Sequence, residues 1–408
     1  MRWTKVKIDS IKATSNYSLV GGPFGSNLTT RDYMEEGIPV IRGNNLSEDG
    51  LFDGTDFVFV SEQKANRLVP NNAFPGDLIF TQRGTLGQVG LIPIESQFQR
   101  YVISQSQMKL TVNPERAHPA FVYYFFRHPA TIQDIKNRVS SSGVPHINLG
   151  TLKELEIPLP PLEVQRKIVS VLSAYDDLIE NNLRRIKLLE ESGRLLYKEW
   201  FVRLRFPGHE HTRIVNGVPE GWEKKNLADV CDEVREAVSP RDVESDTPYI
   251  GLEHIPRRSI TLSTWAEAQE VTSSKHRFCA GDILFGKIRP YFHKVGIAFV
   301  DGVASSDAIV IRPKADSVRS LVLLIVSSDR FVAEASQKVK EGSKMPRADW
   351  KIMREYAIAL PPHALLDTLN SYICPITQQL KLLTMENRKL KQARDILLPK
   401  LMSGEVEV

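Results

Sequence analysis

The chain has 408 residues, and its 42% hydrophobic content is enough to fill the cores of two or three globular domains. No long apolar run and no apolar signal core are present, so we expect neither a membrane span nor secretion. With 53 basic and 49 acidic residues, the net charge of +4 permits nucleic-acid binding without demonstrating it. The widely spaced Cys231, Cys279 and Cys374 suit a reducing cytoplasm and argue against a disulfide framework or a cysteine metal site.

In chain order, mixed regions alternate with long helical regions. Short β-rich segments bounded by Gly, Asn and Asp turns include residues 57–60, 77–82, 107–112 and 307–313. Helical stretches at 118–128 and 317–338 belong to the same mixed regions. We therefore predict an α+β protein with a mixed domain at 1–160, a long helix at 161–205, a second mixed domain at 206–362, and a second long helix with a short tail at 363–408.

The second half of the sequence repeats the first. The segments IPVIRGNNL (38–46), PGDLIF (75–80) and QVGLIP (88–93) recur in the same order as TPYIGLEHI (247–255), AGDILF (280–285) and KVGIAF (294–299). Residues 143–163 then match residues 344–364 at a constant offset of 201. Two copies with a period of this length are too few and too long for a solenoid, so the sequence indicates a duplicated module with pseudo-symmetric domains.

Both helical regions carry an apolar seam with alternating steps of four and three residues, which is typical of a coiled coil. The first seam consists of Ile168, Leu172, Tyr175, Ile179, Asn182, Ile186, Leu189, Gly193, Leu196 and Trp200. The second consists of Leu366, Leu369, Ile373, Ile376, Leu380, Leu383, Asn387, Leu390, Arg394, Leu397 and Leu401. A two-fold arrangement of the modules would make the two helices an antiparallel pair. Each seam contains one Asn, which can fix the register, and Pro375 should kink the second helix or separate its first turns.

The stretch GDILFGKI (281–288) resembles a phosphate-binding loop that lacks its Ser or Thr. Its counterpart GDLIFTQRG (76–84) has no Gly-Lys pair, and Gly-Asp precedes the apolar residues in both copies. We therefore interpret the stretch as a turn leading into a strand. GHEH (208–211) lacks spaced Cys or acidic partners, and we predict no metal or catalytic residues.

Basic and amide side chains gather in corresponding loops of the two mixed domains. Arg, Asn and Gln can bind base edges, whereas Ser and Lys suit phosphates. The candidate DNA contacts of the first domain are Arg42, Asn44, Asn45, Gln82, Arg83, Arg100, Gln105, Ser141, Ser142 and His146. Those of the second domain are Arg257, Arg258, Lys287, Arg289, Tyr291, Lys294, Ser306, Lys344 and Arg347.

The order of GGPFGSNL (21–28), IPVIRGNNL, AFPGDLIF (73–80), residues 157–182 and NGVPEGWEKKNLADV (216–230) resembles the specificity subunit of type I restriction–modification systems. The resemblance covers essentially the whole chain. It implies that each mixed domain is a target recognition domain for one half of a bipartite DNA sequence. It also implies that the long helices are spacers that set the gap and dock two methyltransferase subunits.

The same resemblance implies a cytoplasmic, non-catalytic subunit with no cofactor of its own. We expect S-adenosylmethionine, ATP and magnesium in the partner methyltransferase and translocase–nuclease subunits. The second copy lacks the pattern of PLEVQRKI (161–168), which leaves open whether both helices bind partners equally well. Two alternatives remain: a phosphate-binding hydrolase that uses Gly281 to Lys287, and a coiled-coil scaffold that does not bind DNA.

Overall fold

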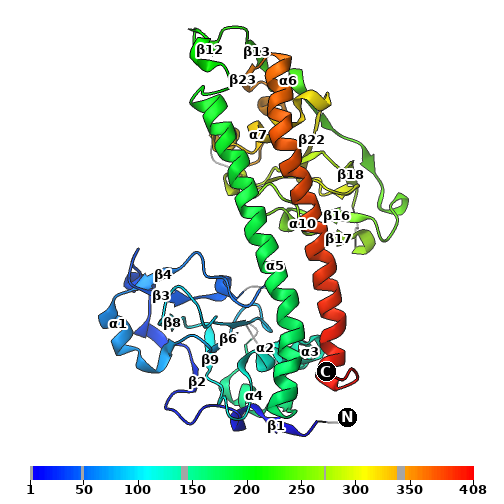
Figure 1. The fold of residues 1–408 in the computed structure, drawn as a ribbon. Helices are drawn as coiled ribbons and strands as arrows, with labels where there is room; N and C mark the ends of the chain where they lie inside the picture. The colour runs from blue at the N-terminus through cyan, green and yellow to red at the C-terminus, as the bar shows by residue number, and fades with distance from the viewer. Residues whose placement is uncertain (1–2, 47–49, 139–145, 271–272, 338–344) are drawn as a thin grey trace. The chain divides into compact units, whose positions relative to one another are not determined.

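The computed structural model describes residues 3–46, 50–138, 146–270, 273–337 and 345–408. The chain divides into two compact units: unit 1 comprises Met1–Asn181 and Lys389–Val408, and unit 2 comprises Asn182–Arg388. The long helices α5 (Leu162–Tyr197) and α10 (His363–Ser403) each contribute residues to both units (Figure 1). Among the helices in these ranges, none is long and apolar enough to cross a membrane.

Unit 1 contains a mixture of short strands and helices. Its strands are β1 (Lys5–Lys7), β2 (Leu19–Gly21), β3 (Ile38–Ile41), β4 (Val58–Val60), β5 (Asn72–Ala73), β6 (Leu78–Thr81), β7 (Val89–Leu91), β8 (Tyr101–Ile103), β9 (Gln107–Leu110) and β10 (Glu156–Pro158). Its short helices are α1 (Glu62–Arg67), α2 (Pro119–Arg127), α3 (Pro129–Asn137) and α4 (Leu149–Glu154). The strands form an antiparallel sheet β2-β9-β6-β7, a mixed sheet β4-β3-β8-β5 and a separate pair β1-β10.

Unit 2 has the same kinds of sheet and helix as unit 1, with an additional strand pair and a five-stranded second sheet. Its strands are β11 (Ile214–Val215), β12 (Val218–Pro219), β13 (Glu223–Asn226), β14 (Cys231–Val234), β15 (Ala237–Val238), β16 (Pro248–Ile250), β17 (Ala266–Glu267), β18 (Lys275–Phe278), β19 (Ile283–Gly286), β20 (Val295–Ile297), β21 (Gly302–Ala304), β22 (Ala308–Pro313) and β23 (Ala357–Leu360). Its short helices are α6 (Leu227–Val230), α7 (Arg319–Val326), α8 (Asp329–Gln337) and α9 (Trp350–Met353). The sheets are β14-β22-β19-β20, β15-β18-β21-β16-β17, β13-β23 and β11-β12.

The two units therefore share one topology. The sheet β14-β22-β19-β20 matches β2-β9-β6-β7, and β13-β23 matches β1-β10. In the second sheet of each unit, one central pair is parallel: β3 with β8, and β16 with β21. The predicted α+β fold with two pseudo-symmetric domains and two long helices is confirmed.

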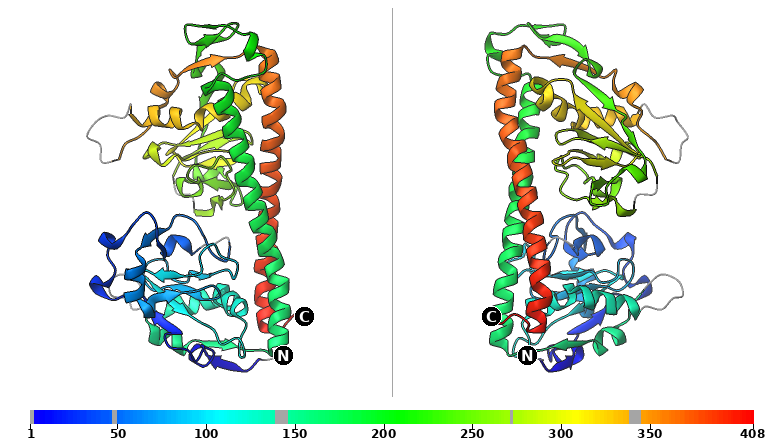
Figure 2. Two further views of the ribbon diagram at one scale, coloured as in Figure 1. Left: turned by 60° about the vertical axis from the view of Figure 1, so that its left-hand side comes forward. Right: turned by 90° about the vertical axis from the view of Figure 1, so that its right-hand side faces the viewer.

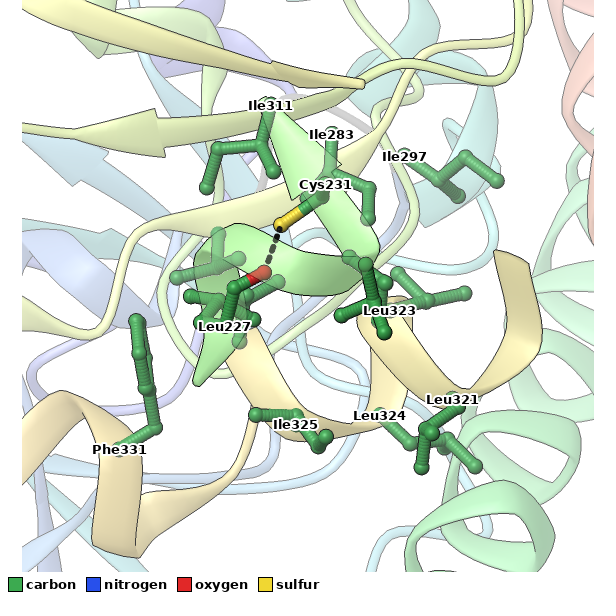
Figure 3. Close-up of a cluster of buried hydrophobic side chains, with 14 of the residues drawn as sticks. Leu227, Cys231, Ile283, Ile297, Ile311, Leu321, Leu323, Leu324, Ile325 and Phe331 are labelled. Atoms are coloured by element: carbon green, nitrogen blue, oxygen red, sulfur yellow. Dashed lines mark hydrogen bonds between the residues drawn. The ribbon is translucent and has the colours of Figure 1, made fainter. Parts of the chain in front are cut away.

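A buried helix forms the centre of each core. All residues from Phe121 to Phe126 in α2, and from Ser320 to Val326 in α7, are buried, as expected for helices that are apolar on every side. In unit 2, α7 packs against the sheet around Cys231 (Figure 3). Burial raises the pKa of the Cys231 thiol to about 12, so this side chain acts as a small apolar residue.

The predicted helix at 317–338 is two helices in the structure. Ser327 and Ser328 direct their hydroxyl groups back to main-chain oxygens of α7, with the Ser328 Oγ atom 2.7 Å from the Ile325 oxygen. The same Ser328 Oγ accepts the Phe331 N–H and so caps α8. Hydroxyl groups that bond locally to the backbone favour helix ends, which explains the break.

Within each unit, the segments of α5 and α10 lie side by side and run in opposite directions (Figure 2). Most seam residues are buried, among them Leu172, Ile179, Ile186, Ile373, Leu380 and Leu383. Six predicted packing residues are only half-buried: Tyr175, Leu189, Leu196, Ile376, Leu390 and Leu397. A straight helix has 3.6 residues per turn and drifts from a strict heptad, so Asp176 and Leu398 are more deeply buried than the neighbouring Tyr175 and Leu397.

Two buried polar contacts join the helices, one in each unit. In unit 2, Asn182 Nδ2 donates to Asn387 Oδ1 at 2.9 Å, so the two seam asparagines meet. In unit 1, Arg394 Nη1 donates to Asp176 Oδ1 at 2.5 Å, and the Tyr124 hydroxyl donates to Asp176 Oδ2 at 2.7 Å. Burial opposes the charge of Arg394, but the neighbouring Asp176 carboxylate raises the pKa of Arg394 above its ordinary value, so the guanidinium stays charged.

Pro375 does not separate the first turns from α10, which was one of the two outcomes predicted for it. The helix runs unbroken from His363 to Ser403, and both Pro375 and Ser371 are exposed. The main-chain oxygen of Ser371 loses its N–H donor at Pro375, but water can replace a donor at an exposed position. Packing of α10 against α5 supplies the remaining stability.

Removing one partner of the Asp176–Arg394 pair should destabilise unit 1 strongly, because it leaves a charge buried without its main counter-ion. We expect Asp176→Leu to lower the free energy of unfolding by about 3–5 kcal/mol, and Asp176→Leu/Arg394→Met to recover most of that loss. Denaturant unfolding measures both. Asp134→Ala removes the exposed pair with Arg138 and should cost less than about 1 kcal/mol. Equal costs for the two single variants would contradict this account.

His118 and His128 cap α2 and α3 only when their rings are neutral. Each Nδ1 atom accepts a main-chain N–H, from Ala120 at 3.2 Å and from Ala130 at 3.1 Å. Burial lowers the pKa of both rings, and the Arg166 charge lowers that of His118 further. The unfolded chain therefore takes up protons first, so stability is lost as the pH falls below about 6.5, toward the lowered pKa values.

A His118→Asn/His128→Asn variant keeps a cap acceptor that does not titrate. Between about pH 7.5 and 5, thermal unfolding should show a smaller loss of stability in this variant than in the wild type, by up to about 2 kcal/mol for two caps. His254, His276 and His293, whose pKa values burial also lowers, provide the same background in both proteins. Parallel pH profiles would show that the caps do not titrate.

Candidate nucleic-acid interface

Three backbone segments of unit 1 meet where its strands end. Gln82, directly after β6, donates its N–H to the Ser106 oxygen at 2.7 Å and accepts the Ile147 N–H at 3.1 Å. Arg83 forms a β-bridge with His146. The structure thus brings together Gln82, Arg83 and His146 from segments that are distant in sequence, and Gln105 lies on the same turn as Ser106. We call these segments the strand-end cluster of unit 1.

Unit 2 has the same cluster with different side chains. Lys287 donates its N–H to the Asp307 oxygen at 2.7 Å, and its own oxygen accepts the Ala348 N–H at 2.9 Å. Ile288 forms a β-bridge with Arg347, as Arg83 does with His146. The strand-end cluster of unit 2 therefore contains four predicted residues: Lys287, Arg289, Ser306 and Arg347.

The cationic side chains of the two clusters differ in how they are held. Arg83 and Arg289 are exposed, and neither forms an ion pair within the residues that the structure describes. Arg347 lies 3.5 Å from the Asp307 carboxylate, and Lys287 Nζ donates to the Ser306 oxygen at 3.0 Å. Arg83 and Arg289 are thus the arginines most available for an anionic ligand.

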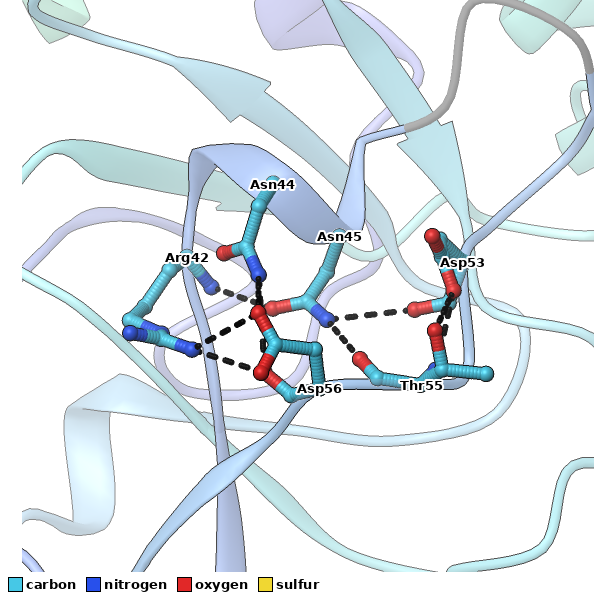
Figure 4. A network of polar contacts seen from close by, with 6 residues as sticks. All are labelled: Arg42, Asn44, Asn45, Asp53, Thr55 and Asp56. Atoms are coloured by element: carbon cyan, nitrogen blue, oxygen red, sulfur yellow. Dashed lines mark hydrogen bonds and ion pairs between the residues drawn. The ribbon is translucent and has the colours of Figure 1, made fainter. Parts of the chain in front are cut away.

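A polar network surrounds the turn after β3, formed by the 3-10 helix η4 (Gly43–Asn45) (Figure 4). Arg42 and Asn44 both bind Asp56: Arg42 Nη2 donates to its main-chain oxygen at 2.7 Å, and Asn44 Nδ2 donates to its carboxylate at 2.8 Å. Asn45 is fully buried, accepts the Arg42 N–H, and donates to the main-chain oxygen of Thr55. The structure therefore gives the buried amide of Asn45, a predicted DNA contact, the role of holding the turn together.

Three further predicted residues have structural contacts. Arg100 donates to the Asn72 side chain at 3.0 Å and does not join the cluster. Lys294 is half-buried, which lowers its pKa, and donates to the main-chain oxygen of Leu252. Gln105 donates to the main-chain oxygens of Gly25 and Leu28, both at 2.6 Å. Arg100 and Lys294 brace neighbouring loops, and Gln105 does so with its amide nitrogen.

The remaining predicted residues of unit 2 surround the β19–β20 connection. Arg257 stacks on Phe292, with its guanidinium carbon 4.0 Å from the ring centroid. Arg258 pairs with Asp329 at 2.9 Å, and Tyr291 is 54% exposed. Sequence reasoning missed Phe292, although an aromatic residue three positions after Arg289 in IRPYF (288–292) was an available signal. Ser141, Ser142 and Lys344 lie outside the described residues.

Within the described residues, other parts of the structure offer no centre for metal binding. Within the described ranges, His, Cys, Asp and Glu side chains form no group of three that could hold a metal ion. The GDILFGKI stretch forms a turn at Gly281, with φ of 95°, and then β19. Its Lys287 is followed by the 3-10 turn η11 (Pro290–Phe292) and not by an α-helix. The predicted turn and strand therefore agree with the structure, whereas a phosphate-binding loop would open a helix.

The duplicated chain corresponds to a known family. A family model for the type I restriction modification DNA specificity domain matches residues 25–191 and again residues 219–380. The chain therefore belongs to the family of type I restriction–modification DNA specificity proteins, and the predicted resemblance is confirmed.

One relative and one solved structure match nearly the whole chain, and a second relative matches part of it. The type I restriction enzyme MjaIX specificity subunit of Methanocaldococcus jannaschii is 23% identical, over 98% of this chain and 93% of its own length. The EcoDI specificity subunit of Escherichia coli is 24% identical, over 63% of this chain and 62% of its own length. The crystal structure of the S subunit from M. genitalium matches with a TM-score of 0.57 at 18% identity, covering 98% of this chain and 96% of that one.

Proposed function

We propose that this chain is the non-catalytic, DNA-reading subunit of a type I restriction–modification complex, and that each unit reads one half of a bipartite target. The observation that carries the proposal is the duplication of the strand-end cluster. The same main-chain contacts support Gln82, Arg83 and His146 in one unit, and Lys287, Ile288 and Arg347 in the other, where Arg289 follows Ile288 directly. A shared frame with different side chains suits two half-sites of different sequence.

Arginine side chains are the main expected readers of bases. The guanidinium of Arg83 or Arg289 can donate two hydrogen bonds to the O6 and N7 atoms of a guanine. Lys287, Ser306 and Arg42 are suited to phosphate contacts, which fix orientation without reading sequence. Double-stranded DNA is thus the proposed ligand of both clusters.

The long helices are the proposed docking surface for two methyltransferase subunits. In unit 2, Leu188, Leu195 and Val202 follow one another at intervals of seven residues and are 68%, 49% and 60% exposed. Exposed apolar residues at heptad spacing favour an additional helix from a partner. In unit 1, Ile396 of α10 is 55% exposed and corresponds to Leu195 at the offset of 201.

A cavity of about 630 Å³ in unit 2 extends this surface. Arg194 and Leu195 of α5, with Val202 of the π-helical turn Lys198–Val202 that follows it, line one side. Ser327 and Arg330 at the α7–α8 connection line the other. This cavity could accommodate an apolar side chain of a docked partner subunit. The partners would supply S-adenosylmethionine for adenine methylation, and the restriction subunits would supply ATP-dependent, magnesium-dependent cleavage.

The alternatives have weaker support. A phosphate-binding hydrolase would need the main-chain N–H groups of a helix start after Lys287, and a strand end with a 3-10 turn occupies that place. A scaffold without DNA binding would have no use for exposed arginines in corresponding clusters. Salt-dependent DNA binding by the complex would exclude the scaffold.

Replacing one cluster arginine should affect one half-site only. Sequencing methylated adenines in a host that carries this chain with its methyltransferase subunit first gives the target. With that target, Arg83→Ala and Arg289→Ala should each lose about 1–3 kcal/mol of discrimination at one half-site and keep the other. Competition binding with half-sites altered one at a time measures this.

The matched control is Arg213→Ala, which removes an exposed arginine outside the clusters. It should reduce affinity slightly and equally for all sequences. A uniform loss for Arg83→Ala and Arg289→Ala would assign both side chains to phosphate contacts. An absence of methylation at any bipartite site would sink the proposed function.

Shortening both helices in step should shorten the tolerated gap. Deleting residues 183–189 of α5 and 380–386 of α10 keeps the Asn182–Asn387 contact and removes about 10 Å of helix. We expect the gap between the methylated half-sites to fall by about three base pairs, at about 3.4 Å per step along the duplex. Deleting either segment alone mispairs the seam and serves as the control. An unchanged gap in the double deletion would refute the spacer role.

A further inference from the structure

The connection between β19 and β20 is a strained turn. Arg289 and His293 have φ angles of 50° and 53°, so two left-handed residues bracket η11. A third, Arg258 with φ of 57°, donates its N–H to the His293 oxygen at 2.9 Å. Non-glycine residues rarely adopt this conformation, and residues held in it cluster at functional sites.

Contacts with α7 and α8 hold the turn in place. The ring of His293 is buried, and its Nε2 atom lies 2.8 Å from the Ser327 oxygen. A main-chain oxygen can only accept, so Nε2 donates there and fixes the ring. On the other side of the turn, the Arg289 N–H donates to the Pro346 oxygen at 2.8 Å. The turn is therefore anchored at both ends.

This turn presents two adjacent aromatic side chains, and two cations lie over one of them. Tyr291 is 54% exposed, and its ring meets Phe292 edge-on with 5.0 Å between the centroids. The guanidinium groups of Arg257 and Arg289 lie over Phe292, 4.0 and 5.8 Å from its centroid. The Phe292 ring thus supports the Tyr291 ring. It also holds the positively charged Arg257 and Arg289 side chains close to Tyr291.

We infer that Tyr291 stacks on a base of the half-site that unit 2 reads, and so unstacks one base step of the DNA. This inference rests on the proposed DNA-reading function. An aromatic ring beside cations is the combination by which proteins bind unstacked bases, since the ring covers the base and the charges hold the phosphates. A rigid turn also resists the force that restores base stacking.

The corresponding loop of unit 1, between β6 and β7, lacks an exposed aromatic side chain. Residues 84–87 read Gly-Thr-Leu-Gly, and Leu86 is buried. No aromatic residue occupies this loop, so unit 1 cannot stack on a base from the same position. The inference therefore predicts an asymmetry: base unstacking in one half-site and none from this loop in the other.

The test uses the complex of the full chain with its methyltransferase subunits, bound to the mapped target. 2-Aminopurine, which fluoresces when unstacked, replaces adenines one at a time in both half-sites. With the wild-type chain, fluorescence should rise at one position in the unit 2 half-site, apart from the methylated adenine that the methyltransferase itself extrudes. Tyr291→Ala should abolish that rise and weaken binding about 5- to 10-fold, since unstacking offsets part of the stacking gain.

Tyr291→Phe keeps the ring and should keep both the fluorescence rise and most of the affinity. If Tyr291→Phe loses as much as Tyr291→Ala, the hydroxyl group acts by hydrogen bonding and the stacking inference is wrong. It is also wrong if Tyr291→Ala binds normally with its fluorescence unchanged, or if it only impairs assembly with the methyltransferase. If the wild-type complex binds no bipartite DNA, the proposed function fails and not merely this inference.

Discussion

A hydrogen bond between Asn182 and Asn387 and an ion pair between Asp176 and Arg394 restrict α5 and α10 to one register. A slip of one heptad would place Asn182 opposite Leu380 and leave two amides buried without each other. Burying unpaired polar groups costs more than the apolar seam would regain, because Leu and Ile pack nearly as well after a slip. The polar contacts thus specify the alignment, while the apolar residues supply most of the association energy. Both cores depend on that alignment, since each contains seam residues of both helices.

Much of the architecture could be predicted because it is repeated. The matching segments located the strands around β6 and β19, and the Pro-Pro pairs located the starts of α5 and α10. Which residues form the buried seam was harder to predict. Tyr175 and Asp176 are neighbours, and the drift of a straight helix from the heptad repeat decides which of them faces the partner helix. The effect of Pro375 was also hard to predict from the sequence. Packing of α10 against α5 outweighs the main-chain hydrogen bond that the exposed proline removes, so the helix continues through it.

The candidate interface was less accessible to sequence reasoning. Asn44 and Asn45 are identical neighbours, yet one is exposed and the other fully buried, and only the turn geometry of η4 separates them. The clusters also depend on pairings between distant segments, such as Arg83 with His146. Residue type identified Arg83 and Arg289 as candidates, but their exposure and lack of ion pairs within the described ranges came from the structure.

The assignment of residues 389–408 to unit 1 has a consequence for how the protein is made. Leu398, Leu401 and Met402 pack in the same core as Phe121, Ile168 and Leu172. A ribosome delivers every residue of unit 2 before it reaches them, so the unit whose synthesis begins first is completed last. Until then, an apolar strip of the nascent unit 1 is uncovered and open to chaperones or to aggregation. A stop codon late in α10 would consequently damage the recognition domain encoded at the opposite end of the gene.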